Sequence, residues 1–189
     1  MSTGIIALLV VGGIVVLLFL WAMAAYNGLV MLREQVRAAW AQIDVMLKRR
    51  HDLIPNLVET VKGYAAHEKE TLANVIAARN QAVSVSGDPA RSSLAEGQLT
   101  GALRQLFAVA EAYPDLKANT NFLQLQGELT NTENQIGNFR QGYNSTVQQY
   151  NTRLLSFPTN LIAGPFGFQA QPFFEIQDAA QREAPAVKF

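Results

Sequence analysis

The sequence contains no cysteine, which excludes disulfide bonds, thiolate metal sites and thiol catalysis. Only two histidines occur, His51 and His67, and Thr71 stands where the second histidine of a His-Glu-x-x-His zinc motif is needed. The chain also lacks a Gly-x-Ser-x-Gly motif, a phosphate-binding loop and a Gly-x-Gly-x-x-Gly motif. We therefore predict no catalytic, cofactor-binding or metal-binding residues and no cofactor.

Charge is scarce as well. Charged residues make up 16% of the 189, below the roughly 25% that is usual in soluble domains. Fifteen basic residues balance fifteen acidic ones, so no net charge attracts the chain to nucleic acid. Because 49% of the residues are hydrophobic, we expect that part of the chain does not face water.

The hydrophobic residues are concentrated at the N-terminus. Residues 1–32 carry no charged side chain, and 5–23 are almost continuously apolar. A helix over 4–25 is about 33 Å long, enough to cross roughly 30 Å of hydrocarbon. A cleaved signal peptide is the alternative, since Ala-Met-Ala at 22–24 resembles a cleavage site. The long apolar run and the absence of a basic N-terminal region favour a retained transmembrane anchor over 1–27.

The residues at the end of this run predict a membrane interface and an orientation. Trp21 and Tyr26 lie where interfacial aromatic side chains are expected, and the first basic residues, Arg33 and Arg37, follow. No lysine or arginine precedes the run. Since positive charge prefers the cytoplasmic side, we expect the N-terminus outside and the main domain in the cytoplasm.

Helical periodicity dominates residues 28–157, which we expect to form one bundle. Four helices are predicted, over residues 29–50, 52–83, 93–113 and 119–157. Asp52 has the character of an N-cap with Pro55 in the first turn, and Ser93 and Glu96 have capping-box spacing. The basic run 48–50 would end the first helix, or else meet anionic lipid. Short connections predict an all-α, antiparallel, up-down four-helix bundle.

The last predicted helix has a heptad seam and an unusual polar face. Apolar and threonine side chains from Phe122 to Tyr150 recur in steps of three and four, which is typical of a coiled coil. Residues 119–157 also contain thirteen Asn or Gln but only four charged residues. Because interfaces are depleted of Lys and Glu, we predict an oligomer interface, with solvation as the alternative. Its predicted helical residues are Asn131, Asn134, Asn138, Gln141 and Gln148.

Residues 158–189 form an aromatic and proline-rich tail. Pro165, Pro172 and Pro185 prevent a long helix. Four phenylalanines would be costly in water, so we expect the tail to pack on the bundle or on a neighbouring subunit. They complete the predicted oligomer interface and are Phe166, Phe168, Phe173 and Phe174.

Several motifs together resemble the bacterial LemA family. They are AWAQID (39–44), KRRHDLIPNLVETVKGYAAHEKETL (48–72), AEAYPDLKANTNFLQLQGELTNTENQI (110–136), Tyr-Asn at 143–144 and 150–151, and FGF and FFE in the tail. The resemblance implies a single-pass protein of the bacterial cytoplasmic membrane with a short exterior N-terminus and a helical-bundle body. It implies no established enzymatic activity, and members are often associated with membrane proteases or membrane-organising systems.

Three functions follow as expectations. The first is a non-enzymatic, membrane-anchored scaffold whose partners are the lipid bilayer and further copies of itself, and which organises or shapes the membrane. The alternative is an adaptor for another membrane protein such as a membrane protease. An enzyme with an unrecognised carboxylate site is the third, and no motif in the sequence supports it.

Overall fold

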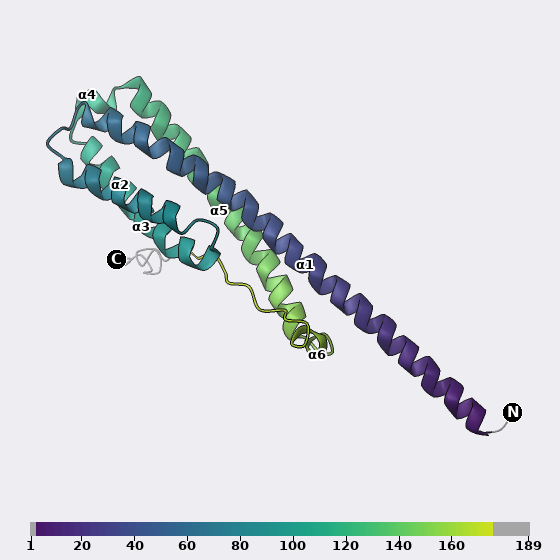
Figure 1. Cartoon of the computed structure of the whole chain (residues 1–189). Coiled ribbons are helices and arrows are strands. Elements are labelled where there is room, and N and C mark those ends of the chain that lie inside the picture. Colours follow the sequence, from purple (N-terminus) through teal and green to yellow (C-terminus); the bar gives the residue numbers. More distant parts are fainter. Residues whose placement is uncertain (1–2, 176–189) are drawn as a thin grey trace, which may run out of the picture. The chain divides into compact units, whose positions relative to one another are not determined.

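The computed structural model describes residues 3–175, and this part of the chain is helical and contains no strand. Its helices are α1 (Thr3–Lys62), α2 (Lys69–Ser84), α3 (Pro89–Ala110), α4 (Pro114–Lys117), α5 (Thr120–Leu155) and α6 (Asn160–Ala163) (Figure 1). The predicted all-α fold with an apolar N-terminal helix is confirmed.

The chain divides into two compact units, and each is described by itself. Unit 1 consists of Met1–Ala39 with Ser145–Gln171, and unit 2 consists of Trp40–Asn144 with Pro172–Phe189. The two longest helices, α1 and α5, contribute residues to both units.

Unit 2 contains the bundle. The C-terminal part of α1, then α2, α3 and the N-terminal part of α5 run in alternating directions, as an up-down bundle requires (Figure 1). Leu57 of α1, Val75 of α2 and Leu106 of α3 are fully buried in its core. On α5, Phe122, Leu129, Ile136 and Tyr143 follow one another at seven-residue intervals and are all buried within unit 2. The inward face of this helix therefore follows the seven-residue period of the sequence.

The predicted boundary between the first two helices of the bundle is wrong. Instead of ending near residue 50, α1 continues through Asp52 and Pro55 to Lys62. Proline at 55 has no N–H for the carbonyl of His51, but Arg79 of α2 donates its Nε to that oxygen at 3.2 Å. Packing of Ile54 and Leu57 in the core holds the helix on both sides of the proline.

The predicted start of the third helix is also wrong, by about one turn. Asp88 is the N-cap of α3, and its Oδ1 accepts from the backbone N–H of Ala90 at 3.0 Å and of Arg91 at 3.3 Å. Proline at position 89 occupies the first helical turn, where a missing N–H costs nothing. The expected capping pair, Ser93 and Glu96, instead lies inside α3 and is buried.

The chain turns sharply after α5. The short helix α6 buries Ile162 and Ala163, and residues 164–175 then follow without regular helix or strand. Phe168 and Phe174 are buried in this segment, at 6% and 0% exposure. The remainder of the predicted tail, 176–189 with Pro185, lies outside the described residues.

Candidate membrane interface and buried ionic cluster

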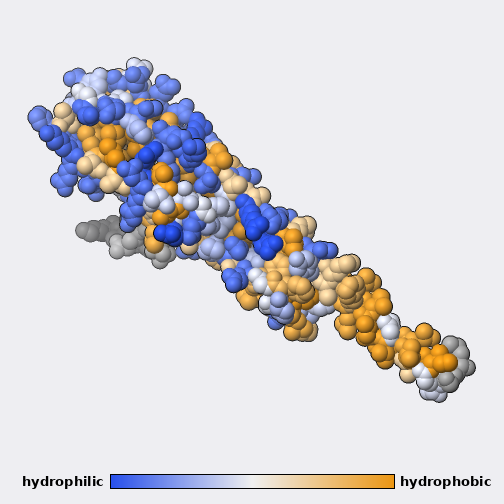
Figure 2. Space-filling model, in the orientation of Figure 1, coloured by the Kyte–Doolittle hydropathy of each residue, from blue (hydrophilic) through white to orange (hydrophobic). Residues whose placement is uncertain are grey.

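Within unit 1, α1 contains a stretch that is long and apolar enough to cross a membrane, and none of it is buried. Figure 2 shows hydrophobic side chains gathered over the N-terminal part of this helix. Leu8, Leu17 and Phe19 are each about two-thirds exposed or more. A core helix of a soluble bundle would be covered by other elements, so this exposure favours a membrane span over the core helix.

The predicted aromatic interface residues lie where the exposed stretch of α1 ends. Trp21 is half-buried. The ring of Tyr26 meets the rings of Phe166 and Phe168 edge-on, with centroids 5.2 and 5.5 Å away. The structure thus joins Tyr26 to two phenylalanines that were predicted for a different site, the oligomer interface.

The two predicted basic interface residues follow on the same helix. The Arg33 guanidinium lies 5.3 Å from the centroid of the Phe168 ring, a cation–π distance. Arg37 is exposed and donates to Glu34 at 2.8 Å. Arg33, Tyr26 and Phe168 therefore form one contact group in unit 1, while Arg37 stays with its helical neighbour.

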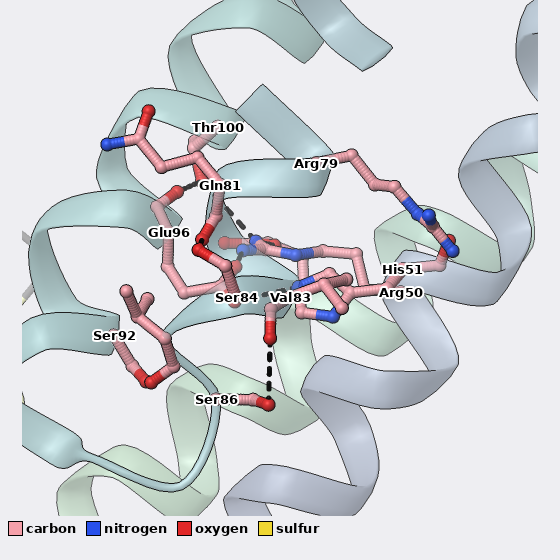
Figure 3. A network of polar contacts seen from close by, with 12 residues as sticks. Arg50, His51, Arg79, Gln81, Val83, Ser84, Ser86, Ser92, Glu96 and Thr100 are labelled. Carbon is pink, nitrogen blue, oxygen red and sulfur yellow. Dashed lines mark hydrogen bonds and ion pairs between the residues drawn. The ribbon is translucent and has the colours of Figure 1, made fainter. Parts of the chain in front are cut away.

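Unit 2 contains a buried ionic cluster that the sequence analysis did not predict. We call Arg50, His51, Glu96 and Glu133 the Arg50 cluster. Arg50 is only 1% exposed; one of its terminal nitrogens pairs with Glu96 and the other donates to Glu133 Oε2 at 2.6 Å. His51 Nε2 lies 2.8 Å from the second oxygen of Glu96 (Figure 3). The cluster connects three helices, α1, α3 and α5, inside unit 2.

Burial lowers the pKa of two residues of this cluster, Arg50 and His51. Desolvation lowers the pKa of Arg50, whereas the charge of Glu133 raises it. Burial, followed by the charges of Arg50 and Arg79, lowers the pKa of His51 to about 4. At neutral pH His51 is therefore uncharged, and the tautomer with its proton on Nε2 donates to Glu96 Oε1.

A cavity of about 400 Å³ adjoins the Arg50 cluster. Arg50, Arg104 and Arg140 line it beside Glu133, together with apolar side chains such as Phe107. Three guanidinium groups and one carboxylate suit an anion better than a cation. Among residues 3–175, no group of three or more His, Asp or Glu residues is placed to hold a metal ion.

A second unpredicted feature in unit 2 fixes the segment that follows residue 171. The Tyr143 hydroxyl donates to the carbonyl of Pro172 at 2.8 Å. Asn144 both accepts from the N–H of Phe174 at 2.9 Å and donates to its carbonyl at 3.1 Å. We call such a Tyr-Asn pair, which holds backbone with its side chains, a Tyr-Asn clamp.

Unit 1 contains its own Tyr-Asn clamp, seven residues further along α5. Here the Tyr150 hydroxyl donates to the carbonyl of Gln169 at 3.0 Å. Asn151 accepts from the N–H of Gln171 and donates to its carbonyl, both at 2.9 Å. A side-chain amide satisfies both polar groups of one residue, as a neighbouring strand would, so these asparagines are structural.

The predicted oligomer-interface residues divide into two groups. Those of α5, namely Asn131, Asn134, Asn138, Gln141 and Gln148, are all exposed, on the side of the helix away from its buried residues. Phe166 and Phe173 are also exposed, at 63% and 43%, whereas Phe168 and Phe174 are buried within their own chain. An exposed neutral polar face is therefore present, and only two of the four phenylalanines are open to a partner.

Signals for the unpredicted residues exist in the sequence but are ambiguous. Arg50 belongs to a basic run that is typical of a helix end, and Glu96 has capping-box spacing with Ser93. The clamps repeat Tyr-Asn after seven residues, the period at which side chains return to one face of α5.

The fold and this geometry define a class: an all-α protein whose first helix bears an uncovered apolar stretch and continues into an up-down bundle. A family model described as the LemA family matches residues 39–189, which is most of the chain. The protein belongs to the LemA family, as its motifs predicted.

The chain is also similar, at low identity, to three curated proteins. The chain is 26% identical over 147 residues to magnetosome protein MamQ 2 of Paramagnetospirillum magneticum, covering 65% of this chain and 54% of that protein. It is 24% identical, with the same coverage, to magnetosome protein MamQ of Magnetospirillum gryphiswaldense. Protein LemA of Metamycoplasma hominis is 26% identical over 118 residues, covering 62% of this chain and 54% of that protein. The chain therefore spans about half the length of the curated relatives it matches.

Proposed function

We propose that this protein is a non-enzymatic, membrane-anchored scaffold that assembles with copies of itself and organises the surrounding bilayer. The observation that carries the proposal is the uncovered apolar stretch of α1, which is long enough to span the hydrocarbon. Such a surface costs about 25 cal/mol for each Å² exposed to water, so a bilayer is its natural environment.

Self-assembly is supported by the exposed face of α5. This face carries Asn and Gln where a solvated helix usually carries Lys and Glu, and depletion of charge is typical of the centre of an interface. Membrane anchoring strengthens even weak lateral contacts, because it confines all copies to one surface and raises their effective concentration.

The relatives support a role of this kind without specifying it. The printed name of MamQ refers to the magnetosome, and neither this name nor the name LemA denotes a reaction. The proposed location is the bacterial cytoplasmic membrane, with the N-terminus outside and unit 2 in the cytoplasm, because Arg33 and Arg37 follow the apolar stretch.

Membrane insertion is tested by fractionating cells that express the full chain. We expect the protein in the membrane pellet after an alkaline wash, which removes peripheral proteins. The double substitution Val11→Arg and Val15→Arg should release it, since an arginine in the hydrocarbon costs about 3 kcal/mol on an insertion scale. Gln105→Arg, on an exposed site of α3, is the control and should stay in the pellet. Unchanged retention of the double variant would argue against the span.

The absence of cysteine makes orientation testable with single thiols. A cysteine at exposed Ser86, in the turn between α2 and α3, should react with an impermeant thiol reagent only after cells are opened. A cysteine at Thr3 should react in intact cells. The reverse pattern would place the bundle outside the cytoplasm.

An adaptor for another membrane protein would use the same exposed surface. It differs from the scaffold in one measurable respect, because it would be recovered as one or two copies bound to a different protein. The mass of the assembly therefore separates the two functions.

A further inference from the structure

We propose that the segment around α6, from the end of α5 to Phe166, is a second membrane-binding element that inserts its exposed apolar side chains into the surface of the bilayer beside α1. The segment runs from the last residue of α5 through α6 to Phe166 (155–166), all within unit 1, and we call it the α5–α6 turn. The inference rests on the proposed function, because it assumes that the apolar stretch of α1 crosses a bilayer.

The first observation is an excess of exposed apolar side chains. Leu155, Phe157, Leu161 and Phe166 are 63–79% exposed, although they lie within twelve residues of one another. Single exposed hydrophobic residues are ordinary, but a group of large ones marks a surface that another phase or molecule covers.

These side chains are held outward by a fixed turn. Thr159, Ile162 and Ala163 are buried, while Leu161, between them on α6, is 63% exposed. Backbone hydrogen bonds from Ala163 to Thr159 at 3.1 Å and from Phe168 to Ala163 at 3.0 Å close the segment. One side of the turn therefore packs on unit 1, and the other presents apolar groups to the surroundings.

The second observation is the absence of charge. No charged residue occurs from position 154 to position 174, and the flanking residues are Arg153 and Glu175. A charged side chain in this segment would oppose entry into the headgroup and acyl boundary. An uncharged aromatic surface suits that region, where amphipathic elements bury their apolar side by about 5–10 Å.

The third observation places the turn at the correct depth. Tyr26 follows the apolar stretch of α1, and its ring contacts that of Phe166 at 5.2 Å between centroids. The turn is thus joined to α1 at the level where hydrocarbon gives way to headgroups. Phe166, one of its exposed side chains, contacts Tyr26 just after the uncovered apolar stretch of α1, so we assign the lipid bilayer, and not a second copy of the chain, as its occupant.

Insertion of the α5–α6 turn would also contribute to the proposed function of organising the bilayer. The turn lies beside α1 near Tyr26. It therefore enters only the leaflet on the side where α1 leaves the membrane. Apolar side chains added to a single leaflet enlarge it relative to the other, and binding of this type depends on membrane curvature. Many copies in one assembly would add these insertions together.

The experiment uses the full chain in vesicles of phosphatidylcholine and phosphatidylglycerol, with single cysteines carrying an environment-sensitive fluorophore. Phe157→Cys and Leu161→Cys report on the turn, Ile14→Cys reports on the span, and Gln105→Cys is the exposed control on α3. Lipids with a spin label near the headgroup, or deep in the acyl chain, quench fluorophores at their own depth.

We expect shallow spin labels to quench the fluorophore at Phe157 and Leu161 and to shift its emission to the blue, while Gln105 keeps its full signal. Deep labels should quench the fluorophore at Ile14.

Full fluorescence at both turn positions with quenching at Ile14 would overturn this inference and leave the anchor intact. Full fluorescence at Ile14 would instead overturn the span, and with it the proposed function. Efficient disulfide crosslinking between chains at Leu161 without quenching would assign the turn to a second copy.

Discussion

Arg50 shows how a single buried charge is made tolerable. A guanidinium at 1% exposure is costly unless its charge is compensated, and two carboxylates from different helices, Glu96 and Glu133, pair with its two terminal nitrogens. Removal of the cation therefore lowers the stability of the bundle, because Glu96 remains buried and loses the charge beside it.

We predict that Arg50→Ala lowers the free energy of unfolding by about 3–5 kcal/mol, the usual cost of leaving one partner of a buried ion pair alone. The neighbouring Arg49 pairs with Glu128 at the surface, so Arg49→Ala should cost no more than about 1 kcal/mol. Urea unfolding of both variants in detergent, followed by helical circular dichroism, measures the difference. Equal losses would show that the Arg50 cluster does not stabilise the bundle.

His51 makes stability depend on pH in a defined direction. Its pKa is about 4 in the folded chain and about 6.5 when unfolded, so the unfolded chain binds more protons between these values. The stability that this difference in pKa contributes is present above pH 6.5 and is lost as the pH falls toward 4. We therefore expect the urea midpoint of the native chain to drop between pH 7 and pH 5.

The variant His51→Gln should flatten this dependence, because glutamine does not titrate. Exposed His67 provides the matched control, and His67→Gln should keep the native slope. If His51→Gln and the native chain lose stability in parallel between pH 7 and pH 5, His51 is not the group responsible.

At the scale of elements, α1 owes its length to a contact with α2. Pro55 leaves the carbonyl of His51 without its helical donor, and Arg79 supplies one from outside. We predict that Arg79→Met costs about 1–3 kcal/mol in the native chain, the penalty for an unsatisfied buried polar group. In a Pro55→Ala background the residue at 55 regains its N–H, so the same substitution should cost clearly less.

This double-mutant cycle is read from urea unfolding of the four chains. A coupling energy between Arg79 and Pro55 is expected because both act on one carbonyl. Additive effects would show that Arg79 stabilises the bundle by another route.

The sequence predicted well the helices whose hydrophobic pattern extends over many turns. The seven-residue spacing from Phe122 to Tyr150 and the apolar run of α1 each persist over many turns, so they identify their helices without reference to neighbours. Local boundary signals failed where a tertiary contact outweighed them. Asp52 and Pro55 form a typical helix start, but nothing near them in sequence indicates the donor on Arg79.

The residues of the candidate sites also differ in whether the sequence alone indicates them or only the fold brings them together. The place of Tyr26 at the membrane interface stays a prediction, drawn from its position at the end of an apolar run; the structure adds its contacts with Phe166 and Phe168. The Arg50 cluster could not be predicted, because its carboxylates come from helices whose pairing only the fold determines. Phe166 and Phe168 are two residues apart and equivalent in sequence, yet one is exposed and the other buried because the turn after α6 directs them differently.

The exposed face of α5 yields a prediction for the whole molecule. Asn138→Glu and Gln141→Lys introduce charges at exposed positions away from the buried residues of the helix. They should reduce the size of the assembly while the helical signal stays constant, because a charge in an interface must be desolvated. Gln105→Glu and Gln105→Lys on α3 are the matched controls and should leave it unchanged. An unaltered size in both α5 variants would remove these positions from the interface.

Self-assembly of the whole molecule is tested by the mass of the full-length protein in mild detergent. Each chain contributes 20.7 kDa. We expect a discrete particle whose protein mass, after subtraction of the detergent, is a large multiple of that value. A protein mass of a single chain across a range of concentrations would contradict the scaffold.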